Sequence, residues 1–344
     1  MKALVKTAKG VGNLCLMDMP EPKAGPGEVL IEVRASGICG TDVHVKADRF
    51  PNWPPVILGH EFSGTVIELG PECQYARIGD RVVGEPHTRH CGQCFLCRTG
   101  NVQICPNKRS PGWGIHGSMA PLLVMPEKLL HRIPDSMDFD TAAVVEPTAN
   151  AVHDVYERAG VVAGDFVVVL GPGPIGLLSA LAARAAGARH IVLVGAPPDE
   201  GLRLGKAREL GFQTVLNVAK DNVTQAVMDL TGGIGADLVI ECSGAPAAIV
   251  GTVDLVRKKG RICAIGLTGG KTVDFPWEKA SFKVVDIYFS LSTSYTSWDR
   301  SIHLIAGGQI PAEQIITHRL PLTEWEAAFA EIEAQRALKV ILHP

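Results

Sequence analysis

The hydrophobic and polar positions follow different patterns in the two halves of the chain. Up to about residue 147, short β-branched runs such as 29–33 and 64–68 are separated by glycine and proline, as expected of short strands joined by turns. Beyond about residue 160, compact apolar runs alternate with stretches of helical length. These runs are 166–170, 191–194, 214–218, 237–241 and 261–265. Such alternation predicts a parallel sheet covered by helices on both faces.

The last stretch, 303–344, returns to mixed structure, with a predicted helix at 323–334 and a closing strand at 338–342. We expect it to pack back on the first module. The fold class is therefore α/β, with a mostly β domain formed by 1–147 and 287–344. A doubly wound parallel-sheet domain is expected at 148–286. A chain of 344 residues is long enough for two such cores.

Composition and charge exclude several functions. Lys plus Arg number 33 and Asp plus Glu 36, which gives a net charge of −3, so no electrostatic footprint for nucleic acid or an anionic membrane is expected. The most apolar stretch, 166–183, is interrupted by glycines and prolines and cannot supply the roughly 20 apolar residues of a membrane helix. Residues 1–10 contain no apolar run of secretory length, so we do not expect export. We expect a cytoplasmic protein without nucleic-acid or membrane partners.

A glycine motif follows the first strand of the second half. Gly171, Gly173 and Gly176 match G-x-G-x-x-G between strand 166–170 and a helix at 175–186. The first glycine permits a tight turn, the second lets the backbone approach a pyrophosphate, and the third lets helix and strand pack closely. Amide groups at the helix start would face the anion. This context predicts a dinucleotide site.

The fingerprint normally continues to an acidic residue about 20 positions later, which binds the ribose 2′-hydroxyl. Gly195 stands at that place, and Arg203 lies just downstream, where it could receive a 2′-phosphate. Asp199 or Glu200 could instead fold back onto the ribose. The cofactor is therefore expected to be NAD or NADP.

Four of the nine cysteines form a cluster with metal-ligand spacing. They follow the pattern C-x2-C-x2-C-x7-C and are Cys91, Cys94, Cys97 and Cys105. Four thiolates on a short loop suit a closed tetrahedral zinc site, which is structural rather than catalytic. An iron–sulfur cluster and reduced free cysteines are the alternatives. The odd number of cysteines argues against a disulfide framework.

A second group carries a thiol, an imidazole and carboxylates: Cys39, His60, Glu61 and Glu146. Considered singly, each is more easily explained as a structural residue. Together, and beside a dinucleotide motif, they suit a zinc ion with one position left for water or substrate.

In this order, the motifs resemble those of the zinc-dependent medium-chain dehydrogenases along essentially the whole chain. They are Cys39-Gly-Thr-Asp42, Gly59-His-Glu61, the four-cysteine loop, Val145-Glu-Pro147, Gly171 to Gly176 and the closing Leu338-Lys-Val340. Because Glu146 stands where the alcohol dehydrogenases have a third zinc-ligating cysteine, the chain is similar to the sorbitol (L-iditol) and L-threonine dehydrogenase branch. The resemblance implies a GroES-like catalytic domain, a Rossmann domain and an active site in the cleft between them.

The resemblance also implies roles for single residues. Cys39, His60 and Glu61 match the catalytic zinc positions, and Glu146 would either ligate the metal or hold it through water. Thr41 and His44 would pass the alcohol proton to solvent. The expected cofactor contacts are Gly171, Gly173, Pro174, Ile175, Gly176, Gly195, Arg203 and Leu267. A homo-oligomer, tetramer or dimer, is expected.

The resulting hypothesis is a zinc-dependent, NAD(P)-dependent oxidation of a small-molecule secondary alcohol to the ketone. Two zinc ions per chain are expected, one catalytic and one structural. A polyol such as sorbitol or L-iditol is the first choice of substrate, followed by L-threonine and a simple secondary alcohol. The alternative from another class is a non-catalytic nucleotide-binding sensor.

Overall fold

The structure is a computed structural model that describes all 344 residues. The chain divides into two compact units. Unit 1 consists of Met1–Glu146, Thr293–Ala306 and Ile316–Pro344, and unit 2 of Pro147–Ser292 and Gly307–Ile315. The domain limits expected from the sequence stay a prediction. No helix is long and apolar enough to cross a membrane.

Unit 1 is built on two sheets. The smaller has the order β2-β1-β4 and the larger β15-β16-β3-β5-β6-β8, with β7 pairing with β3. Their strands are β1 (Lys2–Lys6), β2 (Leu14–Asp18), β3 (Glu28–Gly37), β4 (Val56–Ile57), β5 (Glu61–Leu69), β6 (Arg81–Gly84), β7 (Leu122–Pro126), β8 (Leu130–Arg132), β15 (Ile316–Pro321) and β16 (Lys339–His343). Because β16 pairs antiparallel with β3, the C-terminal stretch completes the sheet that the N-terminal stretch begins.

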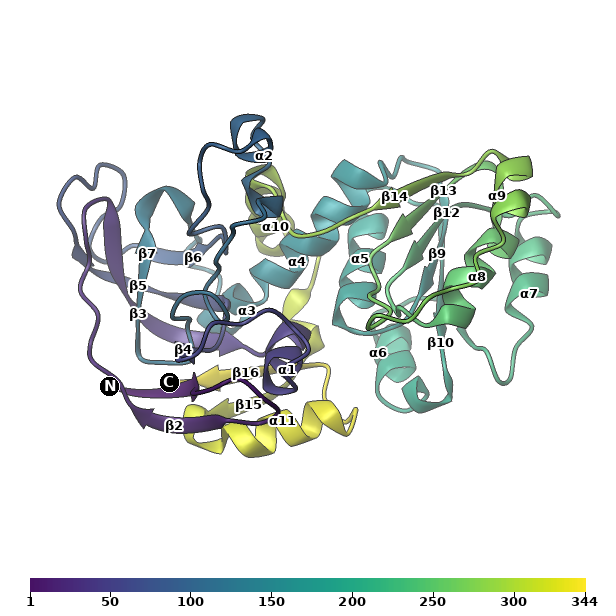
Figure 1. Cartoon of the computed structure of the whole chain (residues 1–344). Helices are drawn as coiled ribbons and strands as arrows, with labels where there is room; N and C mark the ends of the chain where they lie inside the picture. Colours follow the sequence, from purple (N-terminus) through teal and green to yellow (C-terminus); the bar gives the residue numbers. More distant parts are fainter. The chain divides into compact units, whose positions relative to one another are not determined.

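The helices of unit 1 are short, and they place the polar loops beside the sheets (Figure 1). They are α1 (Gly40–Lys46), α2 (Phe95–Arg98), η1 (Val102–Ile104), η2 (Glu127–Leu129), α3 (Phe139–Ala143), α10 (Tyr295–Ala306), η6 (Leu322–Glu324) and α11 (Trp325–Glu333). One apolar core joins β1 and β16 to α1 and α11 and includes Leu4, Val45, Phe329 and Val340. This core anchors α1, whose N-terminal end carries Cys39.

Unit 2 contains a six-stranded sheet in which every pairing is parallel. Its order is β11-β10-β9-β12-β13-β14, which is the order 3-2-1-4-5-6 of a doubly wound dinucleotide-binding sheet. The strands are β9 (Phe166–Leu170), β10 (His190–Gly195), β11 (Thr214–Asn217), β12 (Ala236–Glu241), β13 (Val256–Ala264) and β14 (Asp286–Phe289). The all-buried run of β9 explains why its sequence is continuously apolar.

Helices cover both faces of this sheet, with α5 and α6 on one side and α7, α8 and α9 on the other (Figure 1). The helical segments are α4 (Val145–Val152), which contains the boundary between the units, η3 (His153–Arg158), α5 (Pro174–Ala185), η4 (Pro197–Asp199), α6 (Arg203–Glu209), α7 (Val223–Leu230), α8 (Pro246–Leu255), α9 (Trp277–Lys283) and η5 (Ala312–Ile315). The α/β class and the Rossmann-type sheet are confirmed.

The helix that follows β10 does not begin directly after the strand. Residues Pro197–Asp199 form a separate 3-10 turn, and α6 starts only at Arg203. The prolines stand at the first two positions of this turn, where their missing N–H groups cost nothing, and Gly201 lies between the turn and α6. Asp199 closes the turn, because its carboxylate accepts from the N–H of Ala196 at 2.8 Å. This turn lies directly beyond the second strand of the dinucleotide fold.

Candidate active site

The four cysteines of the metal-ligand pattern converge in unit 1. Their sulfurs all lie within 4.8 Å of one another; Cys94 and Cys97 are 3.5 Å apart and Cys91 and Cys105 3.6 Å apart. Backbone N–H groups of Gln93 and Cys94 lower the pKa of Cys91 to about 6, which favours the thiolate that binds metal. Four sulfurs at this spacing fit a closed structural zinc site.

The second candidate group is organised by Asp42, on α1. Cys39 is the residue immediately before this helix, and its N–H donates to Asp42 Oδ2 at 2.9 Å. The other oxygen, Oδ1, accepts from the N–H of Gly59 at 3.3 Å. One buried carboxylate therefore ties the loop of Cys39 to the loop that carries His60.

His60 is buried among acidic groups. Burial alone would lower its pKa, but the charge of and hydrogen bond to the Cys39 side chain, with the carboxylates of Asp42 and Glu146, raise that pKa to about 10. Its Nδ1 atom is buried and has no hydrogen-bond partner, and the nearest carboxylate oxygen, Asp42 Oδ1, is 4.0 Å away. An orphaned imidazole nitrogen beside a thiol and a carboxylate fits the ligand set of a zinc ion.

Glu61 follows His60 in the chain but already has a partner. Lys339 Nζ lies 2.8 Å from Oε1 and 2.7 Å from Oε2 of Glu61, and it also donates to the carbonyl of Ile38 at 3.1 Å. Both side chains are buried. The carboxylate is therefore held close to the Cys39 loop by a lysine from the last strand.

Glu146 is buried at the start of α4. It contributes to the electrostatic field at His60, at Lys339 and at Lys108. Burial lowers the pKa of Lys108 to about 8, although Glu146 and Glu85 oppose the shift. Lys108, three residues beyond Cys105, therefore interacts electrostatically with Glu146 of the second candidate group.

Thr41 and His44 both lie on α1, three residues apart, a spacing that places side chains on the same face of a helix. Burial, with a smaller contribution from Arg49, lowers the pKa of His44. The ring is therefore neutral at pH 7 and can accept a proton.

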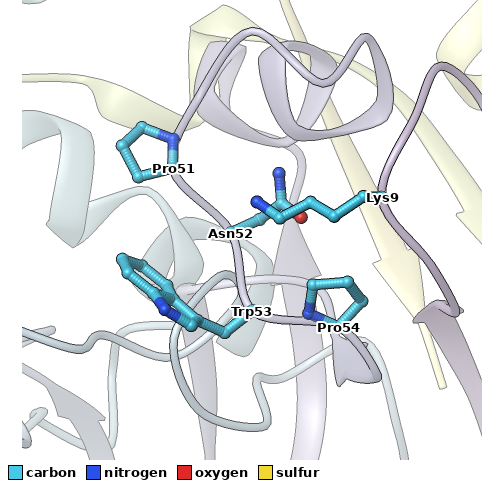
Figure 2. Close-up of a pocket in the computed structure, with 5 residues that line it drawn as sticks. All are labelled: Lys9, Pro51, Asn52, Trp53 and Pro54. Carbon is cyan, nitrogen blue, oxygen red and sulfur yellow. The ribbon is translucent and has the colours of Figure 1, made fainter.

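The loop after α1 borders a pocket of about 390 Å³ that is lined by Lys9, Pro51, Asn52, Trp53 and Pro54. Figure 2 shows the Lys9 side chain reaching across to Asn52, with Trp53 and Pro54 on the near side of the same loop. The indole of Trp53 is covered by the guanidinium of Arg109, 3.5 Å from the ring centroid. The pocket therefore combines an aromatic surface with an amide and one ammonium group.

In unit 2, the glycine turn joins β9 to α5. Gly171 has a left-handed φ of 97°, and a Cβ on Gly176 would collide with the carbonyl of Gly171. These are the conformational freedom and the close approach for which the motif uses glycine. Gly173 is the residue just before α5, and Pro174 and Ile175 form its first turn.

A pocket of about 360 Å³ lies beside this turn. It is lined by Gly171, Gly195, Ala196, Asp199 and Ser243 together with apolar residues that include Val218, Val223, Ala248 and Leu255. Gly173, Pro174, Ile175, Gly176, Arg203 and Leu267 do not line it, and Leu267 is exposed. Apolar walls with a few polar groups suit an adenosine moiety.

Two residues with a positioning role were missed at the level of the sequence. Asp42 stands three residues after Cys39, the spacing of a capping box, and that signal could have identified it. Lys339 lies in the closing Leu338-Lys-Val340 motif, but its pairing with Glu61, 278 residues away, could not be predicted from a local pattern.

Comparison with known proteins agrees with this arrangement. Residues 25–135 match the alcohol dehydrogenase GroES-like domain, and residues 174–307 match the zinc-binding dehydrogenase domain. The chain is 36% identical to sorbitol dehydrogenase of Halalkalibacterium halodurans over 344 residues, covering 100% of this chain and 99% of the relative. It is also 36% identical to L-threonine 3-dehydrogenase of Pyrococcus horikoshii, with 99% and 98% covered.

Among solved structures, a dehydrogenase from Sinorhizobium meliloti 1021 bound to NADP superimposes with a TM-score of 0.92 at 31% identity, covering 100% of this chain and 99% of the other. Sequence and fold thus agree along the full length. The chain belongs to the zinc-dependent medium-chain alcohol dehydrogenases, a family of NAD(P)-dependent oxidoreductases.

Proposed function

We propose that this enzyme oxidises a secondary alcohol of a polyol, of the sorbitol or L-iditol type, to the ketone with NAD(P). The observation that carries the proposal is the buried His60 Nδ1, which lacks a partner beside Cys39, Asp42 and Glu146. Cys39, His60 and Glu146 would hold the catalytic zinc, with Glu61 as the alternative carboxylate. Zinc at such a site acts as a Lewis acid that lowers the pKa of an alcohol.

The chain's own residues then handle the proton. His44 has a lowered pKa, so it is neutral and able to take the proton that the alcohol loses. Thr41 lies one helical turn before it on α1 and would connect the alcohol to the imidazole through its hydroxyl, which both donates and accepts. The nicotinamide, when bound, accepts the hydride.

Asp42 and Lys339 act by positioning. Asp42 fixes the two loops that carry Cys39 and His60, and Lys339 neutralises Glu61 while its ammonium group also binds the carbonyl of Ile38. Contacts of this kind orient metal ligands; because only the ligand atoms of the four cysteines all lie within 4.8 Å of one another, Cys39, His60 and Glu146 would have to draw together to hold an ion. Cys91, Cys94, Cys97 and Cys105 would hold the second, structural zinc.

The pocket after α1 offers polar groups that a hydroxyl-rich substrate can use, although none of the residues assigned to the metal or to the proton path lines it. Its lining offers an indole, an amide and an ammonium group but no carboxylate. The neighbouring carboxylate of Asp48 already accepts from Asn52 Nδ2 at 3.0 Å and from the N–H of Gly10 at 2.8 Å. A carboxylate with two such bonds keeps acceptor capacity, so Asp48 does not exclude the ammonium group of threonine; polyol hydroxyls can use the amide and the lysine. L-Threonine is the second candidate, because a curated relative of equal identity carries that name.

The test is a comparison of kcat/KM for sorbitol, L-iditol, L-threonine and 2-propanol with each dinucleotide. We expect a polyol to give the highest value. Trp53→Ala should raise KM for polyols and leave kcat nearly unchanged, as for loss of uniform binding, whereas Cys39→Ser should abolish turnover. A higher kcat/KM for L-threonine would replace the polyol assignment, and full activity of the Cys39→Ser variant would refute the metal site.

A further inference from the structure

The second strand of the dinucleotide fold, β10, ends at Gly195, where the fold normally carries an acidic residue. A Cβ built on Gly195 would lie 3.1 Å from the Cβ of Asp199, 2.9 Å from Leu204 Cδ2 and 3.0 Å from Pro172 Cγ. The contact with the Cβ of Asp199 is the one that bears on cofactor binding. Asp199 occupies the space into which a side chain at position 195 would project.

Asp199 is held in this place by its own turn. Its Oδ2 accepts from the N–H of Ala196 at 2.8 Å, and its Oδ1 accepts from Arg203 Nη1 at 2.9 Å. The residue is buried and lines the pocket beside the glycine turn. A carboxylate offers about four lone-pair positions, so these two bonds leave acceptor capacity for a hydroxyl.

The neighbouring Glu200 faces a different set of partners. Its Oε2 accepts from Asn217 Nδ2 at 2.5 Å and lies 3.4 Å from Lys220, while Oε1 lies 3.3 Å from Arg208. Glu200 does not line the pocket. Of the two acidic residues that the sequence placed near the ribose, only Asp199 borders the space where the nucleotide would lie.

The cations around this turn are already paired with carboxylates. Arg203 is paired with Asp199, and Arg208 and Lys220 are paired with Glu200. Only Nη1 of Arg203 bonds to Asp199, and the buried Nε has no hydrogen-bond partner, but a 2′-phosphate on this guanidinium would lie close to the Asp199 carboxylate. Two like charges at such a distance repel each other strongly where the site is buried.

From this geometry we propose that Asp199, carried on the Pro197–Asp199 turn, replaces the missing acid of β10 and makes the enzyme select NAD over NADP by binding the adenosine ribose. The inference rests on the proposed dehydrogenase function and specifies its cofactor. Arg203 acts as a positioning residue that orients the carboxylate. The NADP seen in the Sinorhizobium neighbour makes the opposite preference the alternative to be tested.

The experiment measures dissociation constants of NAD and NADP by calorimetry in the absence of any alcohol. The wild type should bind NAD at least about tenfold more tightly than NADP, the difference expected for one hydrogen bond to a charged group. Asp199→Asn keeps the shape of the side chain but removes its charge, so the preference should fall about tenfold or invert. Glu200→Gln, the matched control, should keep the wild-type ratio.

Arg203→Gln separates the two possible roles of the arginine. If Asp199 is the selecting group, this variant keeps a preference for NAD; if Arg203 receives a 2′-phosphate, it loses affinity for NADP specifically. Tighter binding of NADP by the wild type, or an equal loss for both dinucleotides in Asp199→Asn, would overturn the inference but leave the dehydrogenase function intact. Failure of the wild type to bind either dinucleotide would instead refute the proposed function itself.

Discussion

Lys339 and Glu61 form a buried ion pair that joins the last strand to the candidate metal site. The ammonium nitrogen lies 2.8 and 2.7 Å from the two carboxylate oxygens, and the side chains are only 4% and 1% exposed. Breaking a buried pair from one side leaves an uncompensated charge, which typically costs about 3–5 kcal/mol. Lys339→Met should therefore lower the free energy of unfolding by about that amount in urea denaturation.

The matched control for this substitution is Lys46→Met. Lys46 pairs with Glu333 at the same 2.7 Å, but these side chains are 28% and 42% exposed. A pair of this kind contributes at most about 1 kcal/mol. Equal losses in the free energy of unfolding would show that the buried Lys339–Glu61 pair stabilises the fold no more than an exposed pair does.

This pair also marks the limit of what the sequence could predict. The strand of β9 coincides with the expected 166–170, and α5 ends at Ala185, just before Gly187, because apolar runs and glycine are local signals. The spacing of the four cysteines likewise predicted that they form one metal site. The partner of Glu61 depends on how β16 closes the sheet, and the place of Asp199 depends on a turn made by two prolines; neither is encoded in a local pattern.

The two metal sites can be distinguished by removing one ligand from each. The purified enzyme should contain two zinc ions per chain, and Cys39→Ser and Cys94→Ser should each contain one, as measured by mass spectrometry of metals. Only Cys94→Ser should expose the 91–105 loop to limited proteolysis, because metal ligation supplies the folding energy of such a loop. A wild type with a single zinc ion would contradict the two-site assignment.

Asp154, in η3 of unit 2, should make stability depend on pH. Burial raises its pKa to about 7, and a hydrogen bond with Ser290, with smaller contributions from His153 and Arg158, offsets this only in part. The folded state therefore retains a proton that the unfolded state has lost above about pH 4, so stability falls as pH rises from about 4 to 7. Three pKa units correspond to a penalty on the order of 4 kcal/mol.

Asp154→Asn removes this ionisation without changing the shape of the side chain. The free energy of unfolding of the variant should exceed that of the wild type by more at pH 8 than at pH 5, as measured by urea denaturation at both pH values. Asp135→Asn makes the same change at a fully exposed side chain and serves as the control. A gain for Asp154→Asn that is the same at both pH values would indicate a packing effect rather than ionisation.

His44 and Arg49 provide the sharpest test of the proton path. His44 must be neutral to accept a proton, so kcat/KM should rise with pH as the ring loses its charge. Burial is the main cause of its lowered pKa, and Arg49 is the second. Arg49→Gln should therefore raise the pKa of His44 and move the acid limb of the profile to higher pH, whereas His44→Ala should reduce the rate by about 10²- to 10⁴-fold.

The control for this test is Arg77→Gln. It removes an equal charge from an exposed position in the same unit and should leave the acid limb of the pH profile in place. An acid limb that does not move in Arg49→Gln, together with an unchanged rate in His44→Ala, would assign the proton to another group.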